Sequence, residues 1–572
     1  MKDFSSLKKN LKKDFSSFKE IKVALLGDSA TQLLSQAIRG TGYNENLNIN
    51  IFEADFNQIE RQIYDPTSEL YDFNPQYIIL FISSYKLLQS YNKSLTQISF
   101  AEEQLQRIKD LITTINNKLD AKIIIYNFNE IDDSVYGSYA SKVESSFLFQ
   151  IRKLNFNLSS YIIEIPNCYV CDLSSIQNQI GFNNLFSPSI YVNTEMVLSI
   201  ESLPVIAFRT VAIVSSLIGK IKKCLILDLD NTLWGGVIGD DGIENIQLGS
   251  LGIGKAFTEF QYWIKKLKNR GIIIAVCSKN TESIAKEPFL KHPDMILKLD
   301  DVAVFIANWN NKVDNIRQIQ RILNIGFDSM VFVDDNPFER NMVKEQIEDI
   351  CIPDLPEDPA NYLQYLSSLD LFETTNFSEE DAKRTTQYQT EFKRLSEKMN
   401  FSNEDDYLKS LNMLSDISEF NSFNSPRVSQ LSQRSNQFNL RTIRYDEDNI
   451  IKISNNSDYA TFAFTLEDKY GDNGLICVVI LKKLDKDILF IDSWFMSCRV
   501  LKRGMENFVL NSLVTYAKEN NYKTIIGEYL PTSKNGIVAN HYNSLGFKET
   551  STNKWTLSVD NYITKKCFIN KK

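Results

Sequence analysis

Strand-like apolar runs alternate with helical patterns over the first two thirds of the chain, and this alternation constrains the fold most. Such runs occur at IKVALLG, YIILFISS (77–84), AKIIIYNF (121–128) and YVCDLSSI (169–176), and the helical pattern FAEEQLQRIKDLITTINNKL separates two of them. A second series begins at KKCLILDLDNTLW and continues through IIIAVCSKN and SMVFVDDNPFER. This βα alternation predicts parallel, doubly wound sheets.

The length of 572 residues and a change of pattern predict several domains. A single core rarely grows beyond about 250–300 residues. From about residue 440 the pattern becomes strand-rich, with a late helix at MENFVLNSLVTYAKEN. We expect a doubly wound domain over 1–203, a second α/β domain with a Rossmann-like core over 204–355, a helical connector over 356–435 and an α+β domain over 436–572. An amphipathic helix is expected over residues 1–20, a linker over 350–376, and connector helix near 378–414.

Charge and composition exclude several classes of protein. The formal net charge is -9, and the only basic block is KKNLKK near the start, which argues against a nucleic-acid binder. We find neither a signal peptide nor an apolar run of about 18 residues, so we expect a cytoplasmic protein that does not enter a membrane. The eight cysteines are scattered, as in a reducing compartment. Cys168 and Cys171 are interpreted as strand residues, with a redox pair as the alternative.

The motif DLDNTLW places Asp228 and Asp230 just beyond the strand-like run KCLIL. Two carboxylates so placed can both reach a crevice at the carboxyl edge of a sheet. Because they repel unless a cation or proton lies between them, the pair suits Mg²⁺. Asp228 can attack phosphorus to form an aspartyl-phosphate, and Asp230 can protonate the leaving group and later activate water. The alternative is a solvated turn or a cap at the end of a strand.

Further candidates follow in a fixed order along the chain. Ser278 can hydrogen-bond a phosphoryl oxygen, and Lys312 can supply positive charge to the phosphate and the nucleophile. Asp334 and Asp335 follow another strand-like run and can complete a magnesium site with Asp228 and Asp230. Thr232 and Lys279 are the remaining candidates for phosphate contacts.

DLDNTLWGGVIGDDG, VCSKN and VDDNPFER resemble the FkbH-like subfamily of the haloacid dehalogenase (HAD) superfamily. The resemblance continues through QLSQRSNQFNLRTIRY (430–445), YGDNGLI (470–476) and SCRVLKRGME (497–506). It implies a magnesium-dependent enzyme that takes a phosphorylated three-carbon substrate, typically 1,3-bisphosphoglycerate. Such enzymes remove phosphate and load the glyceryl group onto the pantetheine thiol of an acyl carrier protein, in polyketide or surface-glycan pathways.

GDSATQ (27–32) resembles the first block of SGNH-type hydrolases, with Ser29 in the place of the nucleophile. Such enzymes need a histidine base, and residues 1–220 contain no histidine. We therefore interpret Ser29 as a helix cap, with Gly27 permitting the turn, in a domain kept for packing or docking. An active hydrolase is the alternative.

The C-terminal part resembles an N-acetyltransferase-like (GNAT) fold, through ANHYNSLGFKE (539–549). SCRVLKRGME would occupy the place of the pantetheine pyrophosphate, so Arg499, Lys502, Arg503 and Gly504 are pantetheine-binding candidates. A solvated basic helix start is the alternative. His541 is interpreted as a packed histidine, although it is this domain's one histidine.

Transfer through an enzyme thioester would need a cysteine. Cys498 ranks ahead of Cys277, because Arg499 and Lys502 would favour its thiolate. The leading hypothesis is a phosphatase that is also a glyceryltransferase. The alternatives are a phosphatase with substrate-selecting flanking domains and a non-catalytic scaffold.

Overall fold

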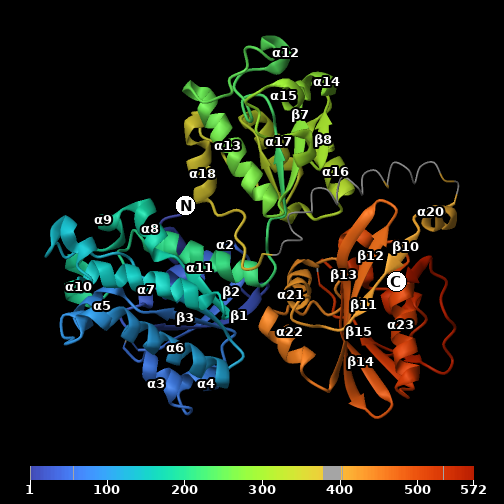
Figure 1. The fold of residues 1–572 in the computed structure, drawn as a ribbon, viewed down its shortest axis with the longest axis horizontal. Coiled ribbons are helices and arrows are strands. Elements are labelled where there is room, and N and C mark those ends of the chain that lie inside the picture. The colour runs from blue at the N-terminus through green and yellow to red at the C-terminus, as the bar shows by residue number, and fades with distance from the viewer. Residues whose placement is uncertain (1, 56, 378–393, 395–400, 402, 533) are drawn as a thin grey trace. The chain divides into compact units, whose positions relative to one another are not determined.

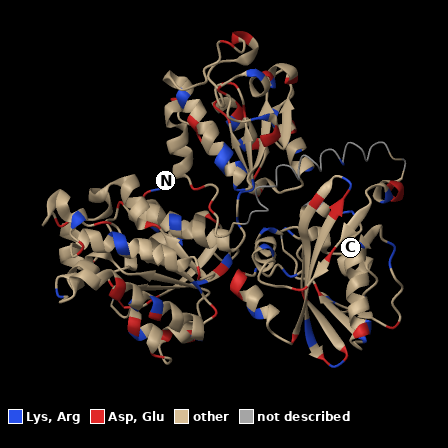
Figure 2. Ribbon diagram, in the orientation of Figure 1, with Lys and Arg blue, Asp and Glu red and all other residues tan. Residues whose placement is uncertain are grey.

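The computed structural model describes residues 2–55, 57–377, 394, 401, 403–532 and 534–572. They form two compact units, Met1–Ser216 and Leu217–Lys572 (Figure 1). Figure 2 shows acidic and basic residues interspersed along the helices and strands. Within the described ranges, no helix has the length and apolar character that crossing a membrane requires.

The first unit is built on a five-stranded parallel sheet in the order β2-β1-β3-β4-β5. The strands are β1 (Lys19–Gly27), β2 (Leu47–Glu53), β3 (Tyr77–Phe81), β4 (Lys122–Tyr126) and β5 (Cys168–Cys171). The helices are α1 (Phe4–Asn10), α2 (Gln32–Asn44), α3 (Ile59–Tyr64), α4 (Glu69–Phe73), α5 (Ser84–Tyr91), α6 (Phe100–Lys118), α7 (Phe147–Ile162), α8 (Leu173–Ile180), α9 (Phe182–Leu185), α10 (Pro188–Thr194) and α11 (Leu203–Leu217).

This sheet confirms the predicted parallel α/β class. The edge strand β2 was missed, since LNINIFE is half polar. The helix predicted over residues 1–20 is shorter than expected: α1 ends at Asn10 and β1 begins at Lys19. Cys168 and Cys171 are buried at the two ends of β5 and form no disulfide in the part of the chain that the structure describes, which agrees with the strand interpretation.

The second unit begins with a four-stranded parallel sheet in the order β8-β7-β6-β9. Its strands are β6 (Cys224–Leu227), β7 (Ile273–Ser278), β8 (Val304–Ala307) and β9 (Met330–Val333), and its helices are α12 (Ile238–Asp241), α13 (Gly252–Asn269), α14 (Glu282–Ala285), α15 (Glu287–Lys291), α16 (Lys312–Leu323), α17 (Pro337–Gln346) and α18 (Tyr362–Ser368). All four strands are almost wholly buried, as expected when helices cover both faces of a parallel sheet.

The predicted linker over 350–376 is wrong for its middle part, because α18 packs against α13 (Figure 1). Tyr362 and Leu366 are buried in the same core as Phe260. The helix has only seven residues, too few to show a clear period in a stretch rich in Pro and Asp. The predicted connector helix near 378–414 lies largely outside the described residues, and α20 (Glu404–Ser410) is its described part.

A nine-stranded mixed sheet completes the second unit, in the order β16-β17-β15-β14-β13-β12-β10-β18, with β11 also paired to β12. The strands are β10 (Met413–Ser415), β11 (Ile417–Ser418), β12 (Tyr459–Asp468), β13 (Gly471–Asp485), β14 (Ile488–Met496), β15 (Thr524–Glu528), β16 (Lys548–Ser551), β17 (Lys554–Ser558) and β18 (Ile569–Lys571). The helices are α21 (Ser425–Arg434), α22 (Glu447–Ser454), α23 (Met505–Glu519) and α24 (His541–Ser544).

The centre of this sheet has the strand pattern of a GNAT-like fold. β12, β13 and β14 are antiparallel, α23 follows β14, and β15 then returns parallel to β14. The pairing of β14 with β15 ends at Phe490 and Ile526. The predicted α+β class is thereby confirmed.

A segment of the chain fills the gap that opens beyond that point. Leu440 N donates to Trp494 O (3.1 Å) and Met496 N donates to Phe438 O (3.0 Å). On the other side Leu530 N donates to Leu440 O (2.9 Å). The segment QFNL (437–440) therefore supplies hydrogen-bond partners to backbone groups in the second half of β14.

Candidate active site

Three carboxylates gather at the carboxyl edge of the four-stranded sheet. Asp228 directly follows β6, and Asp334 and Asp335 follow the adjacent β9. One oxygen from each lies within 4.8 Å of the others. Parallel strands end at the same edge, so neighbouring strands deliver side chains to one point even though the residues are a hundred positions apart.

Lys312 lies among these carboxylates, at the first position of α16. Its Nζ is 3.0 Å from Asp228 Oδ1 and 2.6 Å from Asp334 Oδ2, and the side chain is buried. Burial alone would lower the pKa of Lys312, but Asp228 and Asp334 raise it. The lysine is therefore held as a cation beside the predicted nucleophile.

The pKa values of Asp334 and Asp335 reflect burial and the repulsion between the crowded carboxylates. Burial, with the Asp228 charge second, raises the pKa of both Asp334 and Asp335. Lys312 opposes this effect in each case. One lysine thus leaves the group short of positive charge.

These observations fit a magnesium ion. The donors are all carboxylate oxygens, which are the hard ligands that Mg²⁺ prefers. A divalent cation would also relieve the repulsion that raises the pKa values of Asp334 and Asp335. Asp228, Asp334 and Asp335 would hold such an ion.

Asp230, predicted as both acid and metal ligand, is turned away from that group. Its carboxylate accepts hydrogen bonds from Trp234 Nε1 (2.9 Å), Ile238 N (3.0 Å) and Asn280 Nδ2 (3.0 Å). Burial raises its pKa, and the charge of Asp228 adds to this. A fixed carboxyl group with a raised pKa suits a general acid better than a metal ligand.

The predicted phosphate contacts fall into two kinds. Ser278 is buried at the end of β7, on the strand next to Asp228. Thr232 Oγ1 lies 3.3 Å from Asp335 Oδ1 and accepts from Asp335 N (3.2 Å), so it orients that carboxylate. Lys279 Nζ pairs with Glu339 Oε1 at 2.5 Å, so its charge is partly neutralised.

Sequence reasoning missed the residues that hold the site in shape. Arg340 Nη1 donates to Asp334 O (2.8 Å) and to Asp335 O (2.7 Å). Trp234 and Asn280 fix Asp230, as described above. Arg340, Trp234 and Asn280 lie inside the motifs VDDNPFER, DLDNTLW and VCSKN. Their closeness in sequence to the aspartates could have indicated that they support the site.

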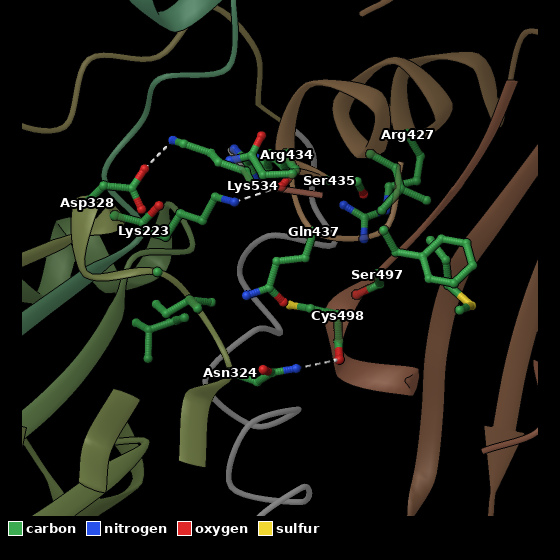
Figure 3. Close-up of a pocket in the computed structure, with 18 residues that line it drawn as sticks. Lys223, Asn324, Asp328, Arg427, Arg434, Ser435, Gln437, Ser497, Cys498 and Lys534 are labelled. Carbon is green, nitrogen blue, oxygen red and sulfur yellow. Dashed lines mark hydrogen bonds and ion pairs between the residues drawn. The ribbon is translucent and has the colours of Figure 1, made fainter. Parts of the chain in front are cut away.

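Cys498 lies apart from this cluster, where the mixed sheet meets the amino edge of the four-stranded sheet. It lines a cavity of about 290 Å³ and a groove of about 860 Å³. Its carbonyl accepts from Asn324 Nδ2 (3.4 Å), and the Gln437 amide points toward its sulfur (Figure 3).

The pantetheine candidates are divided by the structure. Lys502 and Gly504 line the groove, and both have positive φ where the chain turns into α23. Arg503 is buried and pairs with Asp468 (3.1 Å), so it is committed to the fold rather than to a phosphate. The side chain of Arg499 lies outside the described part of the structure.

His541 and Cys277 are both buried by packing. The His541 ring lies edge-on to Trp494, with centroids 4.5 Å apart, and burial lowers its pKa to about 3. This confirms the packed interpretation and argues against a base. Burial strongly raises the pKa of Cys277, so its thiol is a poor nucleophile.

The prediction that Ser29 caps a helix is wrong. The cap position of α2 belongs to Thr31, whose hydroxyl donates to Glu53 Oε1 (2.9 Å). The Ser29 hydroxyl is buried without a hydrogen-bond partner in the described ranges. Gly27 is required by close approach, since a Cβ there would lie 2.6 Å from Thr31 Cγ2.

Comparisons with known proteins agree with this geometry. Residues 22–215 match the FkbH N-terminal domain. The chain is 56% identical to the N-terminal part of the protein BF1531 from Bacteroides fragilis, whose crystal structure contains a phosphatase domain complexed with Mg. That match covers 66% of this chain and 100% of the other, with a TM-score of 0.64.

The C-terminal part matches the ribosomal-protein-S18-alanine N-acetyltransferase from Escherichia coli at 15% identity. This match covers 26% of the present chain and 99% of the other, with a TM-score of 0.20. No protein with a curated description matches the chain.

A parallel sheet whose carboxyl edge carries D-x-D, a buried lysine and a second acidic pair defines an HAD-type protein. The chain belongs to the FkbH-like family of that superfamily.

Proposed function

We propose that the protein is a magnesium-dependent phosphatase that also transfers a glyceryl unit to an acyl carrier protein. The observation that carries the first activity is the pairing of Lys312 with Asp228 and Asp334 beside Asp335. The phosphatase domain complexed with Mg in the 56% identical protein supports the same reaction here.

In the phosphatase reaction, a carboxylate oxygen of Asp228 attacks phosphorus while the ester oxygen leaves. Asp230 gives its proton to that oxygen, which its raised pKa allows. Asp230 then takes a proton from water, the water oxygen attacks the aspartyl-phosphate, and inorganic phosphate leaves with Asp228 restored. A magnesium ion held by Asp228, Asp334 and Asp335 would supply charge to the phosphoryl oxygens.

Lys312 and Ser278 have positioning roles in this reaction. The buried ammonium of Lys312 orients Asp228 and balances the charge that develops on the phosphoryl group. Ser278, at the end of the next strand, is placed to bond a phosphoryl oxygen.

For acyl transfer we assign Cys498. Its sulfur attacks the carbonyl carbon of an acyl phosphate such as 1,3-bisphosphoglycerate, the C–O bond to phosphate breaks, and the thiol proton passes to the departing phosphate. The thiol of a carrier-bound pantetheine then attacks the thioester, and its proton passes to the departing Cys498 sulfur. The groove that runs from Lys502 and Gly504 to Cys498 supports this assignment, because it can guide a pantetheine arm to the sulfur.

We further propose that the first unit docks or packs and has no hydrolase activity. The buried Ser29 hydroxyl and the absence of histidine from residues 1–220 support this role. The domain limits proposed are 1–203, 204–355, 356–435 and 436–572.

Intact-protein mass spectrometry tests the proposal. The enzyme is incubated with 1,3-bisphosphoglycerate and Mg²⁺, with and without a carrier protein. We expect a glyceryl or phosphoglyceryl adduct on the enzyme that moves to the carrier. Cys498→Ser should abolish the enzyme adduct, whereas Cys567→Ser, at another half-buried cysteine, should keep it.

An adduct that survives in Cys498→Ser but is lost in Cys277→Ser would move the relay to the phosphate site. Phosphate release without any carrier loading would leave only the phosphatase, with flanking domains that select its substrate. If there is neither release nor loading, the enzyme assignment is refuted in favour of a scaffold.

A further inference from the structure

Tyr362 is a buried tyrosine that the phosphatase reaction described above does not use. It is the first residue of α18, and only 3% of it is exposed. Its ring lies edge-on to Phe257 and Phe260 of α13, with centroids 6.3 and 6.2 Å away. This packing fixes the ring against the helix that lies beside α18 (Figure 1). Because a buried tyrosine hydroxyl usually finds a hydrogen-bond partner, the group that it contacts is informative.

The hydroxyl of Tyr362 contacts the loop that carries the two motif aspartates. Its Oη donates to the backbone oxygen of Asn231 at 3.3 Å. Asn231 directly follows Asp230, the proposed general acid. A helix from outside the sequence motifs of the site thus bonds the backbone next to that acid.

Asn231 has a backbone conformation that few residues adopt. Its φ is +54°, in the left-handed region, which asparagine tolerates better than most residues with a side chain. Its side chain supports the turn, since Gly236 N donates to Asn231 Oδ1 (2.9 Å). Beyond this turn the chain folds back, and Trp234 Nε1 and Ile238 N reach the carboxylate of Asp230. The conformation of Asn231 therefore bears on where that carboxylate points.

The peptide group between Asn231 and Thr232 is held on both sides. Tyr362 donates to its carbonyl oxygen, and its N–H, from Thr232, donates to Leu229 O (3.0 Å). Since a peptide group is planar, two bonds on opposite sides fix its orientation. Loss of the Tyr362 hydroxyl would release one of these two sides.

We propose that Tyr362 is a positioning residue for Asp230. Its hydroxyl holds the left-handed turn at Asn231 and thereby keeps the Asp230 carboxyl group in the orientation from which it protonates the leaving oxygen. Tyr362 itself does not touch the reacting atoms. This role rests on the proposed phosphatase reaction and adds to it a residue from α18.

Two phosphate esters with different leaving groups test this role. An alkoxide needs the proton of Asp230 as the P–O bond breaks, whereas 4-nitrophenolate leaves readily without it. Rates of phosphate release from glycerol 2-phosphate and 4-nitrophenyl phosphate are measured with the full-length protein and Mg²⁺. The value of kcat/KM is compared, because it covers only the steps up to the aspartyl-phosphate.

Tyr362→Phe keeps the ring and its packing and removes only the hydroxyl. We expect kcat/KM for glycerol 2-phosphate to fall about three- to tenfold, which corresponds to the loss of one hydrogen bond. The value for 4-nitrophenyl phosphate should fall by less than about twofold. The ratio of the two values does not depend on the fraction of protein that is folded, so a loss of stability cannot imitate this result.

Tyr365→Phe is the matched control. Tyr365 lies on the same helix and packs against the same core, and loss of its hydroxyl should leave the ratio unchanged. A double variant tests the route of the effect. If Tyr362 acts through Asp230, Tyr362→Phe should cause no further loss when it is added to Asp230→Asn.

Three results would overturn the proposal. They are an equal loss for both esters, a ratio that matches the one for Tyr365→Phe, and a full additional loss in the Asp230→Asn protein. A higher Mg²⁺ requirement with an unchanged ratio would also overturn it, because the hydroxyl would then act on Asp335 through Thr232. Native protein that releases phosphate from neither ester would refute the phosphatase together with this role, whereas an active native enzyme with any of the other results refutes the role alone.

Discussion

The two parallel sheets of this chain each place an aspartate directly after a central strand, but only one of them has built a reactive site there. Asp28 follows β1 and accepts from Ser83 N at 3.1 and 2.9 Å. Burial raises its pKa to about 6. Asp228 follows β6 and is surrounded by Lys312, Asp334 and Asp335.

The difference comes from what the neighbouring strand ends deliver. The end of β3 brings serines and a backbone N–H to Asp28, whereas the end of β9 brings two carboxylates to Asp228, and α16 begins with a lysine. An aspartate after one strand therefore forms a reactive site only when neighbouring elements supply the other charged groups. Replacing equivalent groups in the two sheets should have opposite consequences.

The largest effect is expected for Asp228→Asn. An amide is not a nucleophile, so phosphate release from a small phosphate ester should fall about a thousandfold or more. Asp314→Asn, at an exposed aspartate of α16, should retain activity. Initial rates of phosphate release with Mg²⁺ measure both, and near-normal release by Asp228→Asn would refute the assignment.

Lys312→Met should cost about 3–5 kcal/mol in metal-free protein, because it leaves buried carboxylates uncompensated. Added Mg²⁺ should recover more stability in this variant than in the native protein. Pulse proteolysis in urea, with peptides of the second unit quantified, gives both values. Lys255→Met, whose lysine is 61% exposed, is the control and should show neither effect.

Asp28→Asn should stabilise the first unit by about 1–3 kcal/mol at pH 8. The raised pKa means that the folded state binds more protons than the unfolded state between pH 3.8 and about 6. Native stability from this group is therefore full below pH 3.8 and is lost as the pH rises through 6. Pulse proteolysis at pH 8 and pH 4.5 measures this pH dependence of the unfolding free energy, and Asp28→Asn should lack it. A loss of stability at pH 8 in this variant would contradict the prediction.

The smallest effect is expected for Ser29→Ala, which should change stability by less than about 0.5 kcal/mol and leave carrier loading intact. Its hydroxyl has no partner to lose in the described ranges. Thr31→Ala should cost about 1.5–3 kcal/mol, because it removes a hydrogen bond to a carboxylate. A hundredfold loss of carrier loading in a stable Ser29→Ala protein would restore the hypothesis that the first unit is an active hydrolase.

Sequence periodicity was sufficient for the strands that lie in the middle of the parallel sheets, such as β3, β4, β6 and β7, since buried strands are continuous apolar runs. It failed for β2 and α18, where only part of the surface is buried. The aspartates Asp228, Asp334 and Asp335 were predicted to meet because parallel strands share an edge, and Lys312 was predicted from its place in the fixed order of motifs. The cavity at Cys498 could not be predicted, because two sheets far apart in sequence form its walls.

Strand β6 has only four residues. Under the proposed assignments, the donor has one energy-rich acyl phosphate bond and one ordinary phosphate ester. Hydrolysis of the first would dissipate the energy that forms the thioester, while hydrolysis of the second wastes nothing. By holding the two reactions at opposite ends of one strand, the sheet separates the step that conserves energy from the step that releases it.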